Sequence, residues 1–171
     1  YCTNAKKVIG KPSSCPKGGG DCNDDPQNYG KFVHPGAKEV CNGRDDNCKS
    51  GTDEGCDHDG DGYCDKNMIT IGKPITCPKG GGDCNDKSGA INPGRKEICN
   101  NIDDDCDNKT DEGCDDDKDG YCDKKMIVIG IPKVCKKGPG DCCDVDFATK
   151  PKVTGWYKNK NSCGNWDYDC N

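Results

Sequence analysis

The chain has 171 residues, of which 18 are Cys, and only 30% of its residues are hydrophobic even when the cysteines are counted. This is too little apolar material for an ordinary core, so the cysteines predict a disulfide framework made in an oxidising compartment, and hence a secreted or cell-surface protein. The net charge is −6, but the 25 Lys and Arg residues are scattered, which argues against nucleic-acid binding, and no apolar run is long enough to span a membrane.

A sequence unit of about 60 residues occurs three times. Residues 8–24 recur at 70–86 and more loosely at 128–144, and residues 35–57 recur at 93–115. The predicted domains are repeat 1 (1–56, incomplete at its N-terminal end), repeat 2 (57–114) and repeat 3 (115–171, divergent and incomplete at its C-terminal end). Because Gly, Pro and Asp are frequent and Glu is rare, we predict a small disulfide-rich fold, mostly irregular with short β-hairpins and little helix. The first residue is Tyr, and we expect that a secretion signal has been removed.

Repeats 2 and 3 open with Asp-rich loops, DHDGDGYCD (57–65) and DDDKDGYCD (115–123). Alternate acids, a Gly at the sixth position and a backbone carbonyl at the seventh are the ligand spacing of an EF-hand-type calcium loop. The twelfth position, where such loops carry Glu, is Met68 or Met126, so another carboxylate must complete the shell. The candidate ligands are Asp57, Asp59, Asp61, Tyr63 and Asp65, and in repeat 3 Asp115, Asp117, Asp119, Tyr121 and Asp123.

The next element has two short apolar runs around a Gly-Pro turn, at residues 68–77 and 126–135, and predicts a β-hairpin. Cysteines flank this element in every repeat. The expected disulfides are therefore Cys2–Cys15, Cys64–Cys77 and Cys122–Cys135. The remaining connectivity stays open, because six cysteines allow many pairings. Cys143, which has no counterpart in the other repeats, has two candidate partners: Cys170 or a cysteine of another chain.

A group of acids and amides follows each predicted hairpin. We expect Asp83 and Asp141 to complete the ligand shells of the Asp-rich loops. The members of the three groups are Asp21, Asn23 and Asp25 in repeat 1, Asp83, Asn85 and Asp86 in repeat 2, and Asp141, Asp144 and Asp146 in repeat 3.

A second acidic loop closes each of the first two repeats. In DDDCDNKTDE the candidate ligands are Asp103, Asp105, Asp107, the carbonyl of Lys109, Asp111 and Glu112. In DDNCKSGTDE they are Asp45, Asn47, Asp53 and Glu54. Lys49 stands where an acid would be, so this second site is predicted to be weaker. Glu39 and Glu97 are further candidates to complete these shells.

All of these ligands are oxygen atoms, and most are anionic, which suits a hard cation. Ca²⁺ is the expected ion, several per chain, because Mg²⁺ tends to keep its waters and uses few protein ligands. A zinc site is not expected, since the chain has no C-x2-C pair and its only histidines are His34 and His58. We also expect no enzymatic activity, because two histidines and a small core offer neither a nucleophile–base pair nor a pocket.

These motifs resemble the family of MopE-type metal-binding repeats of bacterial surface proteins. That repeat runs D-x-D-x-D-G-Y, D-C-D-D, P-G-A-x-E-x-C and D-N-D-C-D-G-x-x-D-E, and the chain carries DHDGDGY, DCND, PGAKEVC and DDNCKSGTDE. The chain is also similar to the calcium-wrapped, disulfide-tied repeats of thrombospondin. The resemblance implies an extracellular, metal-binding, non-enzymatic protein. MopE is associated with copper through histidines and a modified Trp. We do not expect copper here, because His34 lies in a Pro-Gly turn and His58 would point outward.

The expected function is that of a secreted calcium-binding structural protein. NWDYDCN places Asp167, Asp169 and Asn171 at the first three ligand positions of a loop, while Tyr1 corresponds to the back half of an Asp-rich loop. Because these half-loops are complementary, we predict head-to-tail association around a shared Ca²⁺ into an extracellular fibre. The alternative is a monomeric calcium-dependent adhesion module that contacts a protein or glycan through aromatics such as Tyr29, Phe32, Trp156 and Tyr157.

Overall fold

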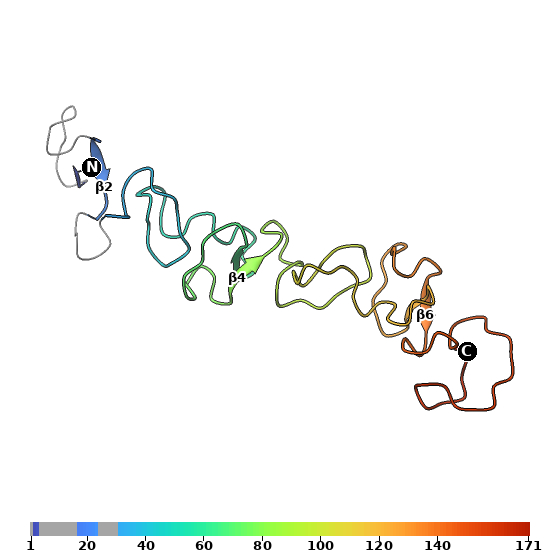
Figure 1. Cartoon of the computed structure of the whole chain (residues 1–171). Coiled ribbons are helices and arrows are strands. Elements are labelled where there is room, and N and C mark those ends of the chain that lie inside the picture. The colour runs from blue at the N-terminus through green and yellow to red at the C-terminus, as the bar shows by residue number, and fades with distance from the viewer. Residues whose placement is uncertain (1, 4–16, 24–30) are drawn as a thin grey trace. The chain divides into compact units, whose positions relative to one another are not determined.

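The computed structural model describes residues 2–3, 17–23 and 31–171, and for residues 2–3 the backbone alone. These residues form irregular loops and turns with six short strands and no helix (Figure 1). The prediction of a disulfide-rich, mostly irregular fold with little helix is confirmed, and the described residues include no helix able to cross a membrane. The strands are β1 (Cys2–Thr3), β2 (Gly19–Asp21), β3 (Tyr63–Asp65), β4 (Gly80–Asp83), β5 (Cys122–Asp123) and β6 (Pro139–Asp141).

The strands form three two-stranded sheets, β1–β2, β3–β4 and β5–β6, and every pair is parallel. The hairpins predicted at residues 68–77 and 126–135 are therefore wrong, because a hairpin would join antiparallel neighbours. The β3–β4 and β5–β6 pairs instead join the end of an Asp-rich loop to the Gly-rich segment that follows the predicted hairpin. The corresponding segment of repeat 1, and the predicted Cys2–Cys15 disulfide, lie outside the described residues.

Hydrogen bonds to an earlier loop explain why the hairpins do not form. The Cys41 N–H donates to the Ile69 carbonyl, and the Ile71 N–H donates to the Cys41 carbonyl, both at 2.9 Å. In the next repeat Cys99 makes the same two bonds with Ile127 and Ile129. The first apolar run of each segment thus pairs through its backbone with a half-cystine distant in sequence and not with a local partner strand.

The chain divides into two compact units, residues 1–92 and 93–171. The first unit contains β3 and β4 with the Asp-rich loop of repeat 2. The second contains β5 and β6 with the Asp-rich loop of repeat 3. The compact units and the sequence repeats therefore have different boundaries.

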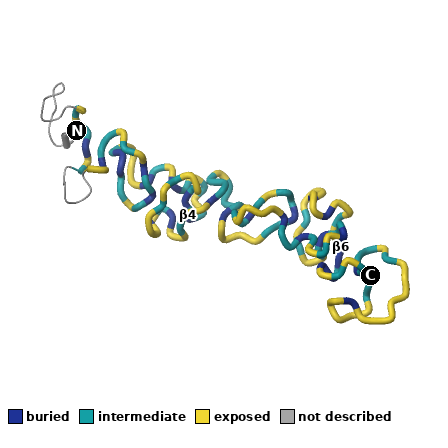
Figure 2. Tube along the Cα trace, viewed as in Figure 1, coloured by how far each residue is buried: buried dark blue, intermediate teal, exposed yellow. Residues whose placement is uncertain are grey.

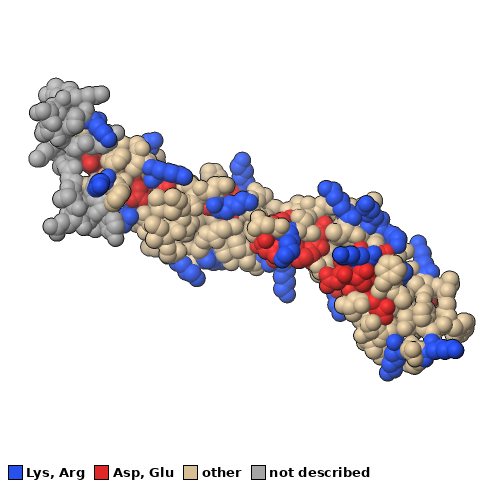
Figure 3. All heavy atoms as spheres, viewed as in Figure 1, with Lys and Arg blue, Asp and Glu red and all other residues tan. Residues whose placement is uncertain are grey.

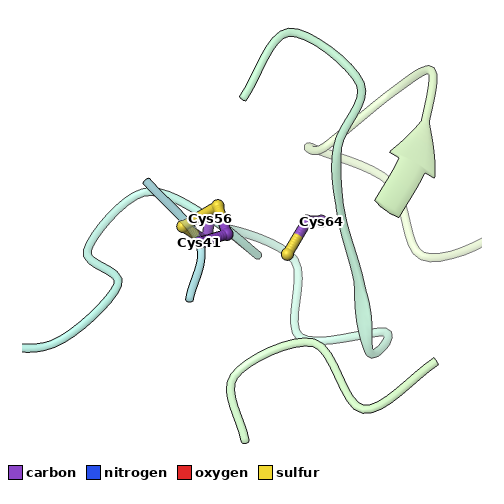
Figure 4. A group of neighbouring side chains, drawn as sticks. All are labelled: Cys41, Cys56 and Cys64. Carbon is purple, nitrogen blue, oxygen red and sulfur yellow. A yellow bond between two sulfur atoms is a disulfide. The ribbon is translucent and has the colours of Figure 1, made fainter. Parts of the chain in front are cut away.

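Buried disulfides take the place of an apolar core in each unit. In the first unit Cys41–Cys56 and Cys64–Cys77 pack together with all four residues fully buried, and Figure 4 shows the first of these bonds beside Cys64. In the second unit Cys99–Cys114 and Cys122–Cys135 form the equivalent cluster. Elsewhere burial is confined to short stretches of the trace (Figure 2). These disulfides close loops of 13 or 15 residues, and in the chain-entropy model a loop of that size is stabilised by about 3 kcal/mol.

All the cysteines from Cys22 to Cys170 are disulfide-bonded. The predicted disulfides Cys64–Cys77 and Cys122–Cys135 are confirmed. The expectation for Cys143 is wrong: Cys143 bonds Cys163 within the same repeat, and Cys170 bonds Cys142. The Cys142–Cys170 bond corresponds to Cys22–Cys48 of repeat 1, so the additional Cys143–Cys163 pair belongs to the divergent segment of repeat 3.

Candidate metal centre

The Asp-rich loop of repeat 2 curls around its own carboxylates. Asp57 accepts three backbone N–H groups, from Gly60 and Asp61 on Oδ1 at 2.8 and 3.2 Å and from Gly62 on Oδ2 at 2.9 Å. Asp59 and Asp61 each accept the N–H two residues ahead, at 3.1 and 2.8 Å. Gly62 has φ 93°, which L side chains rarely adopt, and it permits the sharp turn. One oxygen from each of Asp57, Asp59 and Asp61 lies within 4.8 Å of the others.

Repeat 3 builds the same loop. Asp115 accepts the N–H of Asp119 on Oδ1 and the N–H of Gly120 on Oδ2, both at 3.0 Å. Asp117 accepts from Asp119 at 3.0 Å, and Asp119 accepts from Tyr121 at 2.7 Å. The alternating Asp spacing therefore gives one local structure in both repeats.

The parallel strand pairs bring a further carboxylate to each loop. The β3–β4 register pairs Asp65 with Asp83, and the β5–β6 register pairs Asp123 with Asp141. Asp83 and Asp141 are fully buried. Each accepts one N–H on Oδ1, from Asn85 at 2.7 Å and from Cys143 at 2.8 Å. The sequence analysis predicts that these two residues complete the ligand shells of the loops. The strand registers place them beside Asp65 and Asp123, at the ends of those loops.

The second oxygen of each of these buried acids has no hydrogen-bond partner among the described residues. The same is true of oxygens in the loop itself. The atoms without a hydrogen bond are Oδ2 of Asp59 and Asp83 in repeat 2 and Oδ2 of Asp117, Asp119 and Asp141 in repeat 3. Of these, Asp119 Oδ2 lies 3.6 Å from the ammonium of Lys150. Burying anionic oxygens without a donor costs several kcal/mol. A cation held between them would offset this cost.

Burial and neighbouring acids raise the pKa values of these carboxyls. Burial raises the pKa of Asp83, and the charges of Asp61 and Asp59 add to the rise. Burial raises the pKa of Asp141 to about 6, with Asp119 and Asp117 adding to the rise. Groups that resist ionisation so strongly are typical of a site that is incomplete without a positive charge.

Asp86 and Asp144, from the groups of acids that follow residues 68–77 and 126–135, also accept hydrogen bonds from the Asp-rich loops. Asp86 accepts the N–H of His58 at 2.7 Å, and Asp144 accepts that of Asp116 at 3.1 Å. Burial raises the pKa of Asp144 to about 7. Asp86 and Asp144 therefore belong to the clusters around the Asp-rich loops and do not form a separate site.

The remaining acids of these groups, where the structure describes them, make no hydrogen bond to the Asp-rich loops of repeats 2 and 3. Asp146 turns toward the divergent segment, where it accepts the N–H groups of Ser162 and Ala148. Asp21 is buried and accepts the N–H of Asn23 at 3.0 Å. Asp25 lies outside the described residues.

A second kind of acidic cluster forms around Glu39 in repeat 1. Glu39 is buried and accepts the N–H groups of Asp46 and Asn47 at 3.4 and 3.1 Å. One oxygen from each of Glu39, Asp45 and Glu54 lies within 4.8 Å of the others. The Asn47 amide donates to Glu54 Oε1 at 2.7 Å, which leaves Asn47 Oδ1 and Glu54 Oε2 buried without a partner. The sequence analysis predicts Glu39 only as an accessory ligand, but in the structure its carboxylate accepts two backbone N–H groups of the loop.

Glu97 organises the equivalent loop of repeat 2. It accepts the N–H groups of Asp104 and Asp105 on Oε1 and that of Asp111 on Oε2. Oxygens of Glu97, Asp103 and Asp105 lie within 4.8 Å of one another. Glu112 Oε2 is buried without a hydrogen-bond partner.

Three other predicted ligands use their carboxylates elsewhere. Asp53 accepts the N–H groups of Asn42 and Gly43, and Asp111 those of Asn100 and Asn101. These two buried acids thus connect the acidic loop to the turn at residues 42–43 in repeat 1 and at residues 100–101 in repeat 2. Asp107 is exposed and pairs with the ammonium of Lys109 at 2.5 Å. Alternating spacing alone does not distinguish such structural acids from acids that face a cluster.

Of the C-terminal candidates, Asp167 and Asp169 are partly exposed and Asn171 is exposed. The N–H of Asp167 donates to Asn165 Oδ1 at 3.1 Å, and the amide of Asn171 donates to Asp169 Oδ2 at 2.5 Å. Asp169 therefore has a local side-chain contact, whereas the hydrogen bond of Asp167 involves its backbone N–H and not its carboxylate.

The donor chemistry of the clusters fits a hard divalent cation. They present carboxylate and amide oxygens, and patches of acidic side chains are visible on the face shown in Figure 3. Sulfur ligands are unavailable: Cys41, Cys56 and Cys64 lie close together, but all three are in disulfides and cannot supply a thiolate. The imidazole of His34 lies 3.2 Å from the Pro35 carbonyl, and His58 is exposed.

Sequence reasoning missed several residues that contact the Asp-rich loops. The ammonium groups of Lys79 and Lys137 donate to the carbonyls of Asp61 and Asp119 in the two repeats alike, but a second pair of residues differs. The amide of Asn92 donates to Asp61 Oδ2 at 2.6 Å, and the ammonium of Lys150 lies 3.6 Å from Asp119 Oδ2. The two residues stand at equivalent positions of repeats 2 and 3. Their distance in sequence from the loops hides the contact, and only the repeat alignment could have drawn attention to the exchange of Asn for Lys.

Comparison with known proteins agrees with this geometry. A family model named Cu-binding MopE and described as a "Putative metal-binding motif" matches residues 21–54 and 83–112. The first match includes the Glu39 cluster, and the second runs from Asp83 to Glu112 of the Glu97 cluster. No curated protein and no solved structure gives a significant match. Two segments of this chain, one in repeat 1 and one in repeat 2, are thus similar to the MopE-type motif.

Proposed function

We propose that this chain is a secreted structural protein whose disulfide-tied repeats bind several Ca²⁺ ions. Disulfides hold each unit together, and buried acidic clusters lie against them. Secretion is part of the proposal because such a density of disulfides persists in an oxidising environment. We also propose that the protein is not an enzyme, since the acidic clusters supply a ligand set and no nucleophile–base pair.

A single observation carries the proposal of metal binding. Asp83 and Asp141 are fully buried, each with one oxygen that no donor satisfies, and each faces a loop of further carboxylates. Uncompensated buried charge of this kind is strongly unfavourable. A bound cation resolves it, and no positively charged side chain from the described residues contacts Asp83 in an ion pair.

Calcium suits these clusters better than the alternatives. Ca²⁺ takes six to eight oxygen ligands at about 2.3–2.6 Å in a flexible geometry, whereas Mg²⁺ demands a near-ideal octahedron and keeps several waters. Copper favours nitrogen and sulfur ligands, which the clusters do not provide.

Isothermal titration calorimetry of the oxidised, EGTA-stripped protein tests the proposal. We expect several Ca²⁺ ions to bind per chain, with Mg²⁺ binding at least about tenfold more weakly and Cu²⁺ not displacing Ca²⁺ from the sites. The absence of Ca²⁺ binding would overturn it, as would tight, stoichiometric binding of copper that excludes calcium.

Self-association into a fibre is the finer part of this proposal. It rests on the alternating spacing of Asp167, Asp169 and Asn171, which we propose as ligands of an ion shared between copies. Electron microscopy of the native material is the test. We expect filaments that shorten or dissolve with EGTA, and a monodisperse monomer at millimolar Ca²⁺ under oxidising conditions would contradict the idea.

A hollow in the divergent segment of repeat 3 favours adhesion as the second candidate function. Tyr157 and Tyr168 stack with ring centroids 3.6 Å apart, and Trp156 and Trp166 are exposed beside them. Exposed aromatic platforms of this kind are typical of binding surfaces. Glycan-array binding by the wild type that Trp156→Ala abolishes would support this function, and binding that the substitution leaves unchanged would exclude this hollow.

A further inference from the structure

A residue that contacts each Asp-rich loop from outside it differs between repeats 2 and 3. In repeat 2, the neutral amide of Asn92 donates to Asp61 Oδ2 at 2.6 Å. In repeat 3 the equivalent residue is Lys150, whose ammonium lies 3.6 Å from Asp119 Oδ2. Asp61 and Asp119 themselves occupy the same position of their loops. One loop thus has a neutral hydrogen-bond donor where the other has a fixed positive charge.

The Lys150 side chain is held in place and is not a mobile surface lysine. It is only 19% exposed, and the Asp119 side chain that it faces is fully buried. The ammonium lies 3.7 Å from the centroid of the Phe147 ring, and the Lys150 N–H donates to the Tyr168 carbonyl at 3.0 Å. Cation–π contact and burial hold the charge beside the carboxylate. Repeat 2 has Gly89 in place of Phe147, so it lacks both the cation and the ring that holds it.

Both loops nevertheless have the features of a cation site. Asp83 and Asp141, the buried acids behind the two loops, each keep one oxygen without a hydrogen-bond partner. The charge that a metal ion would meet is different in the two loops. In repeat 3 the ammonium already offsets part of the negative charge of Asp117, Asp119 and Asp141, and it would repel a second cation a few ångströms away.

We propose that Lys150 sets the cation affinity of the repeat 3 loop, so that residues 115–123 form a low-affinity Ca²⁺ site and residues 57–65 a high-affinity one. This inference rests on the calcium binding proposed above. Lys150 is a resident counter-ion that partly satisfies its loop when Ca²⁺ is scarce, whereas the repeat 2 loop depends on the metal. The two loops would then fill at different Ca²⁺ concentrations, although their ligand spacing is the same.

An exchange of the two residues tests the inference on the full, oxidised chain. Ca²⁺ alone is titrated while NMR follows the amide resonances of Gly62 and Gly120, which report the two loops separately. We expect half-saturation of Gly62 at a Ca²⁺ concentration at least about tenfold lower than that of Gly120. Lys150→Asn should increase the affinity reported by Gly120 by about tenfold or more, and Asn92→Lys should decrease that reported by Gly62 by a similar factor.

Lys158→Asn is the matched control, since it removes the same charge from an exposed position of the same segment. It should leave both affinities unchanged. A second readout is independent of metal: without Ca²⁺, hydrogen exchange at Gly120 should be faster in Lys150→Asn than in the wild type. If Lys150→Asn disturbs the Cys142–Cys170 or Cys143–Cys163 disulfide, the Asn92→Lys arm in the first unit still decides the question.

The outcomes separate this inference from the proposed function. If Ca²⁺ shifts neither glycine resonance in any variant, the calcium function fails and the inference fails with it. If Ca²⁺ binds but the exchange changes neither affinity, or Lys150→Asn weakens binding at Gly120, then Lys150 is not a competing counter-ion. In that case the inference is overturned while the calcium function stands.

Discussion

Buried carboxylates of this chain fall into two kinds that differ in how their oxygens are satisfied. Both oxygens of Asp53 and of Asp111 accept backbone N–H groups of a neighbouring loop. Asp83 and Asp141 satisfy only Oδ1 and leave Oδ2 without a donor. The first kind is complete within the protein and stabilises a turn, whereas the second kind needs a cation. This difference decides which acids we assign to metal.

Asp83→Asn tests this assignment at one residue. The amide oxygen can still accept the Asn85 N–H, so the metal-free fold should be retained, while the missing charge should lower the Ca²⁺ affinity of the repeat 2 loop by about 1–3 kcal/mol. Asp107→Asn is the control, because it removes the same charge from an exposed acid that pairs with Lys109. Equal losses of affinity in the two variants, measured by calorimetric titration, would mean that only net charge matters.

The raised pKa values of Asp141 and Asp144 predict how pH acts on repeat 3. In the folded, metal-free protein these carboxyls have pKa values of about 6 and about 7, because they are buried among Asp116, Asp117, Asp119 and Asp123. The unfolded chain releases these protons near pH 3.8. Between these pKa values the folded state therefore holds more protons than the unfolded state, and raising the pH through this window lowers the stability.

We therefore expect the metal-free protein to unfold at a lower temperature at pH 8 than at pH 5. Ca²⁺ competes with the same protons, so its affinity for the repeat 3 loop should fall as the pH drops below about 7. Differential scanning calorimetry with EGTA, and calcium titrations across this range, check both trends. Stability that rises with pH in EGTA would contradict the prediction.

At the scale of elements, the sequence predicts structures held by hydrogen bonds between neighbouring residues, but it does not predict pairings between segments distant in sequence. The Asp spacing and the sixth-position glycine define the loops 57–65 and 115–123, because their hydrogen bonds join residues two to five positions apart. The predicted hairpins are absent because Cys41 and Cys99 take the hydrogen bonds of the apolar runs that follow them. Such distant partners leave no trace in hydrophobic alternation, and neither do the roles of Asp53 and Asp111.

Two glycines of the same loop should respond differently to substitution. Gly62 has φ 93°, outside the region that L residues tolerate, and an added Cβ would lie 3.4 Å from the Lys79 side chain. Gly62→Ala should therefore destabilise the protein by about 1–3 kcal/mol. Gly60 has φ 75°, and its counterpart in repeat 3 is Lys118 with φ 62°. Gly60→Lys should thus be nearly neutral, and chemical denaturation with matched m-values will show whether the two variants differ.

Loss of the Cys64–Cys77 disulfide should weaken Ca²⁺ binding to the repeat 2 loop more than loss of Cys143–Cys163, the disulfide found only in repeat 3. Cys64–Cys77 spans the segment between β3 and β4, which together place Asp65 beside Asp83. Replacing both cysteines with Ser should cost about 3 kcal/mol and also weaken Ca²⁺ binding to the repeat 2 loop. The matched control is Cys143→Ser with Cys163→Ser, which opens a loop of similar size in the divergent segment and should leave binding to the repeat 2 loop unchanged.

At the scale of the whole molecule, the described residues have little besides disulfides and the proposed metal ions to oppose the conformational entropy of the chain. The buried hydrophobic residues among the described part of the chain are Val33 and nine cysteines. Large apolar side chains such as Ile75, Ile131 and Trp156 are exposed. Disulfides restrict the unfolded chain, but they do not neutralise the buried acids. We therefore infer that Ca²⁺ supplies the part of the stability that an apolar core provides in other proteins.

Thermal unfolding of the disulfide-intact protein, in millimolar Ca²⁺ and in EGTA, tests this dependence most directly. A ligand at 100 times its Kd adds about 2.7 kcal/mol per site, so several occupied sites should raise the unfolding temperature by tens of degrees. Mg²⁺ at the same concentration should restore only a small part of this shift. Identical unfolding curves in Ca²⁺ and EGTA would contradict the conclusion that bound calcium holds the fold together.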